Sequence, residues 1–183
     1  ADIIRKGIPA ALCMSMIKYA LESFPDTLIQ PATILKLLNR VVEANIEPGM
    51  FVTMFYGLYK RKSNEFIFSS AGHEPGLFYN AKEDTFEDME ARGIVLGVKN
   101  DATYKQHMKA LEKGDMIILL TDGVTECRRG EEFIEKEEVI AVVRKFQHLH
   151  PQQMVKKVFQ YFEELQDFNL CDDFTLIAIK RNE

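Results

Sequence analysis

The chain has 183 residues, a hydrophobic fraction of 46%, a charged fraction of 28% and a formal net charge of -5. These values are typical of one compact soluble domain, and they give no electrostatic reason to expect binding to nucleic acid or to an anionic membrane. No apolar run approaches the roughly 20 residues that span a bilayer, and Asp2 and Lys6 interrupt the start where a signal peptide needs apolar residues. We therefore expect a single cytoplasmic domain over residues 1–183, with neither nucleic acid nor a membrane as partner.

The cysteines and the first residues give two further expectations. Cys13, Cys127 and Cys171 lack the spacing of a metal site, and their odd number argues against a disulfide framework. We interpret them as reduced thiols. The chain starts at Ala1 without an initiator methionine, in what reads as a strand already begun, so we expect the first strands of the domain to be absent from this sequence.

Two helices are predicted first. Pro9 suits the first turn of a helix over Ile8–Phe24, in which apolar residues recur at helical spacing. The residues that recur at this spacing are Ile8, Leu12, Met16 and Tyr19. A second helix is predicted from Pro31 to about Ala44, with an inner face of Ile34, Leu37, Leu38 and Val41.

The middle of the chain changes to the pattern of antiparallel strands, in which aromatic and β-branched runs alternate with turn residues. The predicted strands are MFVTMFYGLYK (50–60), NEFIFSSAG (64–72), PGLFYNA (75–81) and DMIILLT (115–121). The charged stretch CRRGEEFIEKEE (127–138) is interpreted as a solvated loop. Two helices are then predicted over KEEVIAVVRKF (136–146) and PQQMVKKVFQYFEELQ (151–166), the latter burying Met154, Val158, Tyr161 and Phe162 or Leu165, before a closing strand, DDFTLIAIK (172–180). Because the order lacks strict βαβ alternation, it predicts an α+β domain in which helices cover antiparallel sheets.

Carboxylates stand at the ends of three predicted strands, at Asp2, at Asp122 and at the pair Asp172 and Asp173. Each taken alone is most often a turn former or a helix cap. If neighbouring strands bring these ends together, the carboxylates repel one another unless a hard cation neutralises them, and ligation by oxygen alone suits Mg²⁺ or Mn²⁺. Two such ions about 4 Å apart can bridge a water, lower its pKa and direct it at phosphorus. Two interpretations of these carboxylates therefore stay open: they are turn residues, or they are the metal ligands of a phosphate-ester hydrolase.

Other catalytic patterns are weaker. The histidines His73, His107, His148 and His150 lack the H-x-x-x-H spacing of zinc ligands, and the sequence has neither a phosphate-binding P-loop nor a G-x-S-x-G nucleophile elbow. Two arginines follow Cys127, but this adjacency alone is weak evidence for a cysteine nucleophile.

Five sequence blocks occur in a characteristic order across essentially the whole chain. They are DIIRKGIPAALCMSM, SSAGHEPGLFY, GIVLGV, LLTDGVTE and CDDFTLIAIKR. In this order the chain resembles the PPM-type, SpoIIE-like bacterial serine phosphatases. The resemblance implies an αββα sandwich of two antiparallel sheets flanked by helices, with two Mn²⁺ or Mg²⁺ ions bound at one end.

The resemblance also implies which residues bind these ions. Asp2 is similar to the metal-ligating Asp of the family's D-x-x-G-x-G block, and the backbone carbonyl of Ile3 is a further ligand. Asp122 matches the Asp of the T-D-G block. Asp172 matches the first Asp of the D-D-x-T block, and Asp173 beside it is an additional candidate. Asp2, Asp122 and Asp172 are thus expected to be catalytic through bound metals.

Two substrate-binding candidates follow from the same blocks. Arg5 replaces the first glycine of the D-x-x-G-x-G block, where it would either strain the backbone and repel the metals or bind a substrate phosphate. Gly72, His73 and Pro75 match the family's Gly-His block, in which His73 either shapes a turn or touches the substrate. The family's upstream strand with a further metal-binding Asp is not in this sequence, so the activity of this chain is open.

The resemblance implies a phosphatase that dephosphorylates a phosphoserine on a STAS-domain anti-sigma factor antagonist and so activates a general stress-response sigma factor. It further implies an upstream activating protein that acts through another domain, and a regulatory role for the helix Ile8–Phe24. The alternative is a catalytically impaired pseudophosphatase, or a binding module for the antagonist, whose binding depends little on Mn²⁺. Assembly as a homodimer is open.

Overall fold

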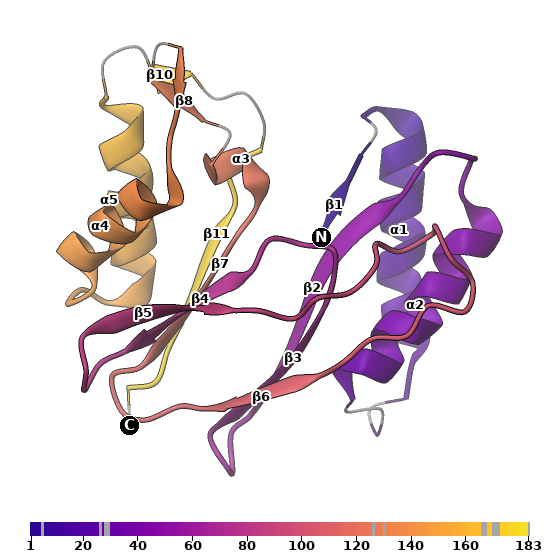
Figure 1. Cartoon of the computed structure of the whole chain (residues 1–183), viewed down its shortest axis with the longest axis horizontal. Helices are drawn as coiled ribbons and strands as arrows, with labels where there is room; N and C mark the ends of the chain where they lie inside the picture. The colour runs from indigo at the N-terminus through magenta and orange to yellow at the C-terminus, as the bar shows by residue number, and fades with distance from the viewer. Residues whose placement is uncertain are drawn as a thin grey trace. The chain divides into compact units, whose positions relative to one another are not determined.

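The computed structural model describes residues 1–4, 6–25, 27, 30–125, 127–129, 131–165, 168–169 and 173–182 (Figure 1). The chain divides into two compact units, which are described separately. Unit 1 comprises Ala1–Pro75 and Glu90–Leu111, and unit 2 comprises Gly76–Met89 and Glu112–Glu183. Each unit has a four-stranded antiparallel sheet, its own helices and its own apolar core.

The sheet of unit 1 has the order β1-β2-β3-β6. Its strands are β1 (Asp2–Ile3), β2 (Val52–Lys60), β3 (Glu65–Ala71) and β6 (His107–Ala110). Strands β2 and β3 pair over most of their length. By contrast, β1 pairs with β2 at only two positions, Asp2 with Thr53 and Ile3 with Val52. This short pairing places the first predicted metal ligand at the edge of the sheet.

Two helices cover the sheet of unit 1. Helix α1 (Ile8–Ser23) and helix α2 (Pro31–Asn45) both have a proline in their first turn, as predicted. Helix α2 packs on β2 and β3, and α1 packs on α2. The buried core residues of this unit include Ile17, Leu35, Leu38, Val42, Val52 and Leu96.

Of the four apolar residues that recur at helical spacing in the first helix, only Met16 packs against the core, and it is half-buried. Ile8, Leu12 and Tyr19 are 77%, 66% and 67% exposed, and the buried residues of α1 are Cys13 and Ile17. Because α1 is apolar at most positions, its periodicity does not identify one inner face. In α2, the predicted residues Ile34 and Leu38 are buried, whereas Leu37 and Val41 are half-buried.

The main sheet of unit 2 has the order β11-β7-β4-β5. Its strands are β4 (Gly76–Asn80), β5 (Thr85–Met89), β7 (Met116–Leu120) and β11 (Leu176–Lys180). Strands β7 and β11 pair at five positions, from Leu176 with Leu120 to Lys180 with Met116. This long pairing fixes the register at the strand ends that carry the remaining predicted ligands.

Three helices and a small second sheet complete unit 2. The helices are α3 (Asp122–Thr125), α4 (Lys136–Phe146) and α5 (Pro151–Glu163). The small sheet, of order β10-β8-β9, consists of β8 (Arg128–Arg129), β9 (Glu132–Phe133) and β10 (Phe168–Asn169). Helix α5 packs on β11 and buries Met154, Val158 and Phe162, as predicted, whereas the predicted Tyr161 is half-buried.

Several elements were not expected from the sequence. Strands β5 and β6 are exposed at most positions, so no apolar run indicates them. The stretch 127–138, interpreted as a solvated loop, instead contributes β8, β9 and the start of α4. Its ordering has a physical cause: Cys127 and Ile134 are buried, and the Ile134 N–H donates to the Cys127 carbonyl at 2.9 Å.

The predicted α+β class is confirmed, because two antiparallel sheets carry flanking helices. The organisation as a single domain stays a prediction. Cys13 and Cys127 are in no disulfide, as expected, and Cys171 lies outside the described residues. Within the part of the chain that the structure describes, no helix is both long and apolar enough to cross a membrane, and the cytoplasmic location stays a prediction.

Candidate active site

The candidate ligand Asp122 lies directly beyond the C-terminal end of β7. It opens the short helix α3, its side chain is half-buried, and its Oδ1 atom accepts a hydrogen bond from the Gly123 N–H at 3.0 Å. This bond joins the aspartate side chain to the N–H of the next residue, so it is a local contact at the start of α3 and not an N-cap bond to the second or third helical N–H. Since a carboxylate has about four acceptor sites on its two oxygens, this contact is compatible with metal ligation.

Thr121 holds the end of β7 against the segment that enters β11. Its N–H donates to the Thr175 carbonyl at 3.2 Å, and its Oγ1 donates to the Asp173 carbonyl at 3.1 Å. The same Oγ1 accepts the Thr175 N–H at 3.3 Å. Asp122 and the exposed Asp173 therefore lie at adjacent strand ends of unit 2, while their role as metal ligands stays a prediction. Asp172 lies outside the described residues.

The candidate ligand Asp2 lies in unit 1, on the edge strand β1. Its side chain is half-buried, and its backbone pairs with Thr53 of β2. The Ile4 N–H donates to the Phe51 carbonyl at 3.3 Å, so the chain after Ile3 also follows β2. Arg5, the first predicted substrate contact, lies outside the described residues.

His73 is held beside the strand that carries Thr53. Its Nδ1 atom lies 2.9 Å from the Thr53 Oγ1 atom in a hydrogen bond, and Thr53 is the pairing partner of Asp2. The backbone of His73 is fixed as well, because its N–H donates to the Ser70 Oγ at 3.1 Å and the Ser70 hydroxyl donates to its carbonyl at 3.3 Å. His73 therefore belongs to the surroundings of Asp2, while its contact with substrate stays a prediction.

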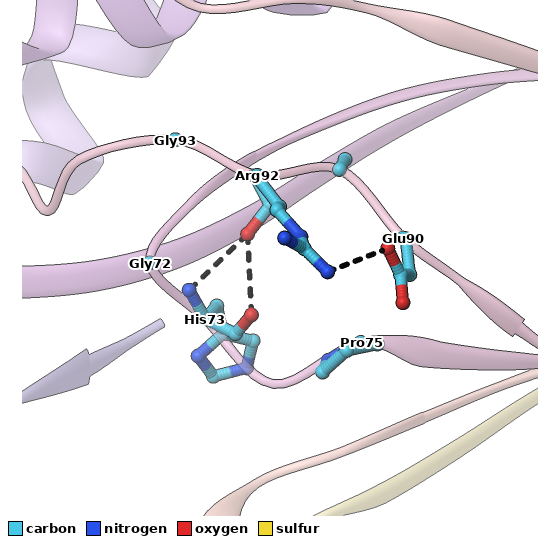
Figure 2. A pocket seen from close by; sticks show the side chains of 8 residues that line it. Gly72, His73, Pro75, Glu90, Arg92 and Gly93 are labelled. Carbon is cyan, nitrogen blue, oxygen red and sulfur yellow. Dashed lines mark hydrogen bonds and ion pairs between the residues drawn. The ribbon is translucent and has the colours of Figure 1, made fainter.

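A pocket of about 330 Å³ opens beside His73. Figure 2 shows the loop that carries Gly72, His73 and Pro75 facing the loop that carries Arg92 and Gly93. The lining residues are Ser70, Gly72, His73, Pro75, Glu90, Ala91, Arg92 and Gly93. Sequence reasoning missed Glu90 and Arg92, because no motif or spacing distinguishes them from other surface charges.

The chemistry of the candidate ligands fits a hard divalent cation. Asp2, Asp122 and Asp173 offer carboxylate oxygens, which Mg²⁺ and Mn²⁺ prefer over nitrogen or sulfur. Among the described residues, no three His, Cys, Asp or Glu side chains gather closely enough to hold a metal by themselves. Asp2 belongs to unit 1, and Asp122 and Asp173 belong to unit 2.

The fold is that of protein phosphatase catalytic domains. The catalytic domain of the serine threonine protein phosphatase PstP, solved in complex with 2 manganese ions, matches with a TM-score of 0.64 at 12% identity, over 97% of this chain and 83% of that one. The RsbU and RsbW domains of Rv1364c from Mycobacterium tuberculosis match with a TM-score of 0.78 at 25% identity, over 98% of this chain and 50% of that one.

Sequence comparison identifies the family. The family model described as Stage II sporulation protein E (SpoIIE) matches residues 1–182, so the chain belongs to the SpoIIE family. Phosphoserine phosphatase RsbU of Bacillus subtilis (strain 168) is 52% identical over 181 residues, which are 99% of this chain and 54% of that protein. The chain thus spans about half the length of this relative, and the predicted resemblance is confirmed.

Proposed function

We propose that this chain is the catalytic part of a metal-dependent protein serine phosphatase. The observation that carries the proposal is its 52% identity, over almost the whole chain, to a protein named as a phosphoserine phosphatase. The fold shared with PstP supports the same class of activity. The proposed substrate is a phosphoserine on a STAS-domain anti-sigma factor antagonist, whose dephosphorylation activates a general stress-response sigma factor.

The proposed cofactor is a pair of Mn²⁺ or Mg²⁺ ions. Their proposed ligands are the carboxylates of Asp2, Asp122, Asp172 and Asp173 and the backbone carbonyl of Ile3. When bound, such ions activate a water for attack on phosphorus and stabilise the negative charge that develops there. In support of this ligand set, the Thr121 hydroxyl bonds the Asp173 carbonyl and the Thr175 N–H next to Asp122, and Asp2 pairs with Thr53 of β2.

The proposal is tested by phosphate release from a phosphoserine-bearing STAS-domain protein. We expect release in Mn²⁺ that stops in excess chelator. Asp122→Ala should lower the rate at least about 100-fold, because a metal contributes several kcal/mol of charge stabilisation in the transition state. Asp101→Ala is the matched control, since Asp101 is an exposed aspartate that pairs only with the exposed Lys99 among the ion pairs described.

The rival function, a pseudophosphatase or binding module, gives a different result in the same experiment. It predicts binding of the phosphorylated STAS-domain protein with an affinity that Mn²⁺ does not change, and no phosphate release in any condition. Release that survives chelation, or that Asp122→Ala leaves unchanged, would contradict the metal-dependent mechanism. Arg5→Gly then tests the proposed phosphate contact: loss of affinity for phosphorylated substrate supports the contact, and a gain in metal affinity indicates that Arg5 repels the metals.

We also propose that helix α1 is regulatory and responds to an upstream activating protein through another domain. In support, α1 follows the Asp2 strand directly and leaves an apolar surface of Ile8, Leu12 and Tyr19 exposed. Met14 is 39% exposed, so Met14→Ser should cost little core packing. A change in Mn²⁺ affinity at an unchanged melting temperature would support regulation, whereas parallel losses in both would show ordinary packing.

A further inference from the structure

The pocket beside His73 has walls of fixed shape. Its two sides, the loop 72–75 and the loop 90–93, both belong to unit 1 (Figure 2). A Cβ atom at Gly93 would overlap the carbonyl oxygen of Ser70, so the second loop packs backbone against strand β3. Gly72 has a φ of +67°, and a Cβ atom there would overlap the Val95 side chain. Glycine thus permits a close approach on each side, which defines the shape of the pocket.

The Ser70 and His73 groups that line the pocket already make hydrogen bonds within the protein. The buried Ser70 hydroxyl makes two hydrogen bonds to the His73 backbone, and the His73 ring bonds Thr53. A ligand therefore gains little from these groups. The charged groups of the lining are His73, if protonated, and the pair Glu90 and Arg92.

Arg92 is the group best placed to recognise a ligand. Its side chain is 89% exposed, and its ion pair with the Glu90 carboxylate, 60% exposed, has an N···O distance of 3.4 Å. An ion pair this exposed contributes little, because water screens both charges. A carboxylate on a ligand can therefore replace Glu90 at the Arg92 guanidinium, whose planar fork binds a carboxylate through two hydrogen bonds.

The pocket lies close to one proposed metal ligand in the same unit. His73 contacts Thr53, which is the backbone partner of Asp2. Paired residues in an antiparallel sheet have Cα atoms about 5 Å apart, and the His73 ring is one further hydrogen bond away, so the edge of the pocket formed by His73 lies on the order of 10 Å from the Asp2 backbone. About three residues of extended polypeptide span this distance. A substrate chain that places its phosphoserine near Asp2 therefore has side chains within reach of the pocket.

We propose that this pocket binds the substrate polypeptide beside the phosphoserine, with Arg92 pairing with an acidic side chain. The proposal rests on the proposed phosphatase function and adds a preference for substrate sequence. The pocket volume suits one or two side chains.

The test compares two synthetic phosphoserine peptides of equal length. One carries Glu at the second and third positions on both sides of the phosphoserine, and the other carries Gln there. We expect wild-type chain with Mn²⁺ to show a kcat/KM about two- to fivefold higher for the Glu peptide, the size of a solvent-exposed ion pair. Arg92→Ala should reduce this ratio to about one. Glu90→Gln should increase it, because Arg92 then has no competing carboxylate at this position.

Two controls separate recognition from folding and from catalysis. Arg61→Ala removes an exposed arginine in the turn at the opposite end of β3, and it should leave the peptide ratio unchanged. Turnover of para-nitrophenyl phosphate, which has no flanking residues, should be equal in wild type and in the Arg92, Glu90 and Arg61 variants. A loss of this turnover in Arg92→Ala would overturn the assignment of Arg92 to flanking residues.

The remaining outcomes decide between the inference and the proposed function. Equal kcat/KM for the two peptides in wild type, or a ratio that persists in Arg92→Ala, would overturn the inference while leaving the phosphatase intact. Equal losses for both peptides in Arg92→Ala would mean that Arg92 binds the phosphate. If wild type turns over neither peptide, the proposed function fails, and fluorescence anisotropy of the two labelled peptides then tests whether the pocket binds an acidic side chain. Tighter binding of the Glu peptide that is lost in Arg92→Ala supports the inference. Equal binding of the two peptides contradicts it.

Discussion

The two units anchor their proposed metal ligands in different ways. In unit 2, the register of β7 and β11 extends over five paired positions, and Thr121 continues the contact to Asp173. In unit 1, β1 pairs at only two positions, and the Thr53–His73 hydrogen bond lies beside it. We infer that the sheet itself fixes the position of Asp122, whereas the position of Asp2 depends more on local side-chain contacts.

The largest effect outside the ligands themselves is expected at Thr121. Thr121→Val keeps the side-chain shape but removes the hydroxyl that bonds the Asp173 carbonyl and the Thr175 N–H. We expect a loss of about 1–2 kcal/mol in the free energy of unfolding and about tenfold weaker Mn²⁺ binding. Urea denaturation and Mn²⁺ titration measure the two effects.

Thr33→Val is the matched control for this substitution. The Thr33 hydroxyl bonds only the exposed Gln30 side chain among the side-chain hydrogen bonds described, so its loss should change neither quantity appreciably. If Thr121→Val binds Mn²⁺ as tightly as wild type does, the hydrogen bonds of the Thr121 hydroxyl do not position a metal ligand.

A smaller effect is expected at the Thr53–His73 contact of unit 1. His73→Ala and Thr53→Val each remove one partner of the 2.9 Å hydrogen bond, and each should weaken Mn²⁺ binding by a factor of about three to ten. The double variant should be no worse than either single variant, because all three lack the same bond. Additive losses in this double-mutant cycle would show that His73 acts on something other than Thr53.

Tyr104 of unit 1 gives a pH-dependent effect without an expected loss of activity at neutral pH. Burial raises the pKa of Tyr104 to about 12. An unfolded tyrosine loses its proton near pH 10. From about pH 10 to pH 12, therefore, only the folded chain retains the proton at this position. The free energy of unfolding consequently falls by roughly 2 kcal/mol as the pH rises through this range.

The variant Tyr104→Phe should remove this alkaline loss. It should also retain stability at pH 7, because the buried Tyr104 hydroxyl has no hydrogen-bond partner in the part of the chain that the structure describes. Urea denaturation of both proteins at pH 9 and pH 11.5 measures the difference. An identical fall in wild type and variant would assign the alkaline loss to other groups.

The sequence predicted the features that depend on strong local patterns. Pro31 and Pro151 mark true helix starts, and the run before Asp122 is a buried strand. It failed where the local pattern is uniform, as in α1, whose apolar residues point both inward and outward. The exposed strands β5 and β6 were missed because their pairing depends on neighbours distant in the sequence.

The sequence likewise predicted only those candidate site residues that stand in strong local patterns. Asp2 and Asp122 were found because each adjoins an apolar strand within a recognisable block. The sequence could not reveal the hydroxyl of Thr121 as a tie between two strand ends, since Thr175 and Asp173 lie more than 50 residues away. Arg92 was missed for a similar reason: its environment is created by the Gly72 and Gly93 loops, which approach each other only in the fold.

The central claim is that Asp122 is a metal ligand and not only a local hydrogen-bond acceptor at the start of a short helix. Electron paramagnetic resonance of free Mn²⁺ measures binding to wild type, Asp122→Asn and the control Asp101→Asn without requiring turnover. Because an asparagine retains an oxygen that can accept the Gly123 N–H but lacks the negative charge, we predict at least about tenfold weaker Mn²⁺ binding in Asp122→Asn alone. Equal Mn²⁺ binding by all three proteins would contradict the metal site and leave Asp122 with only a local structural role at the start of α3.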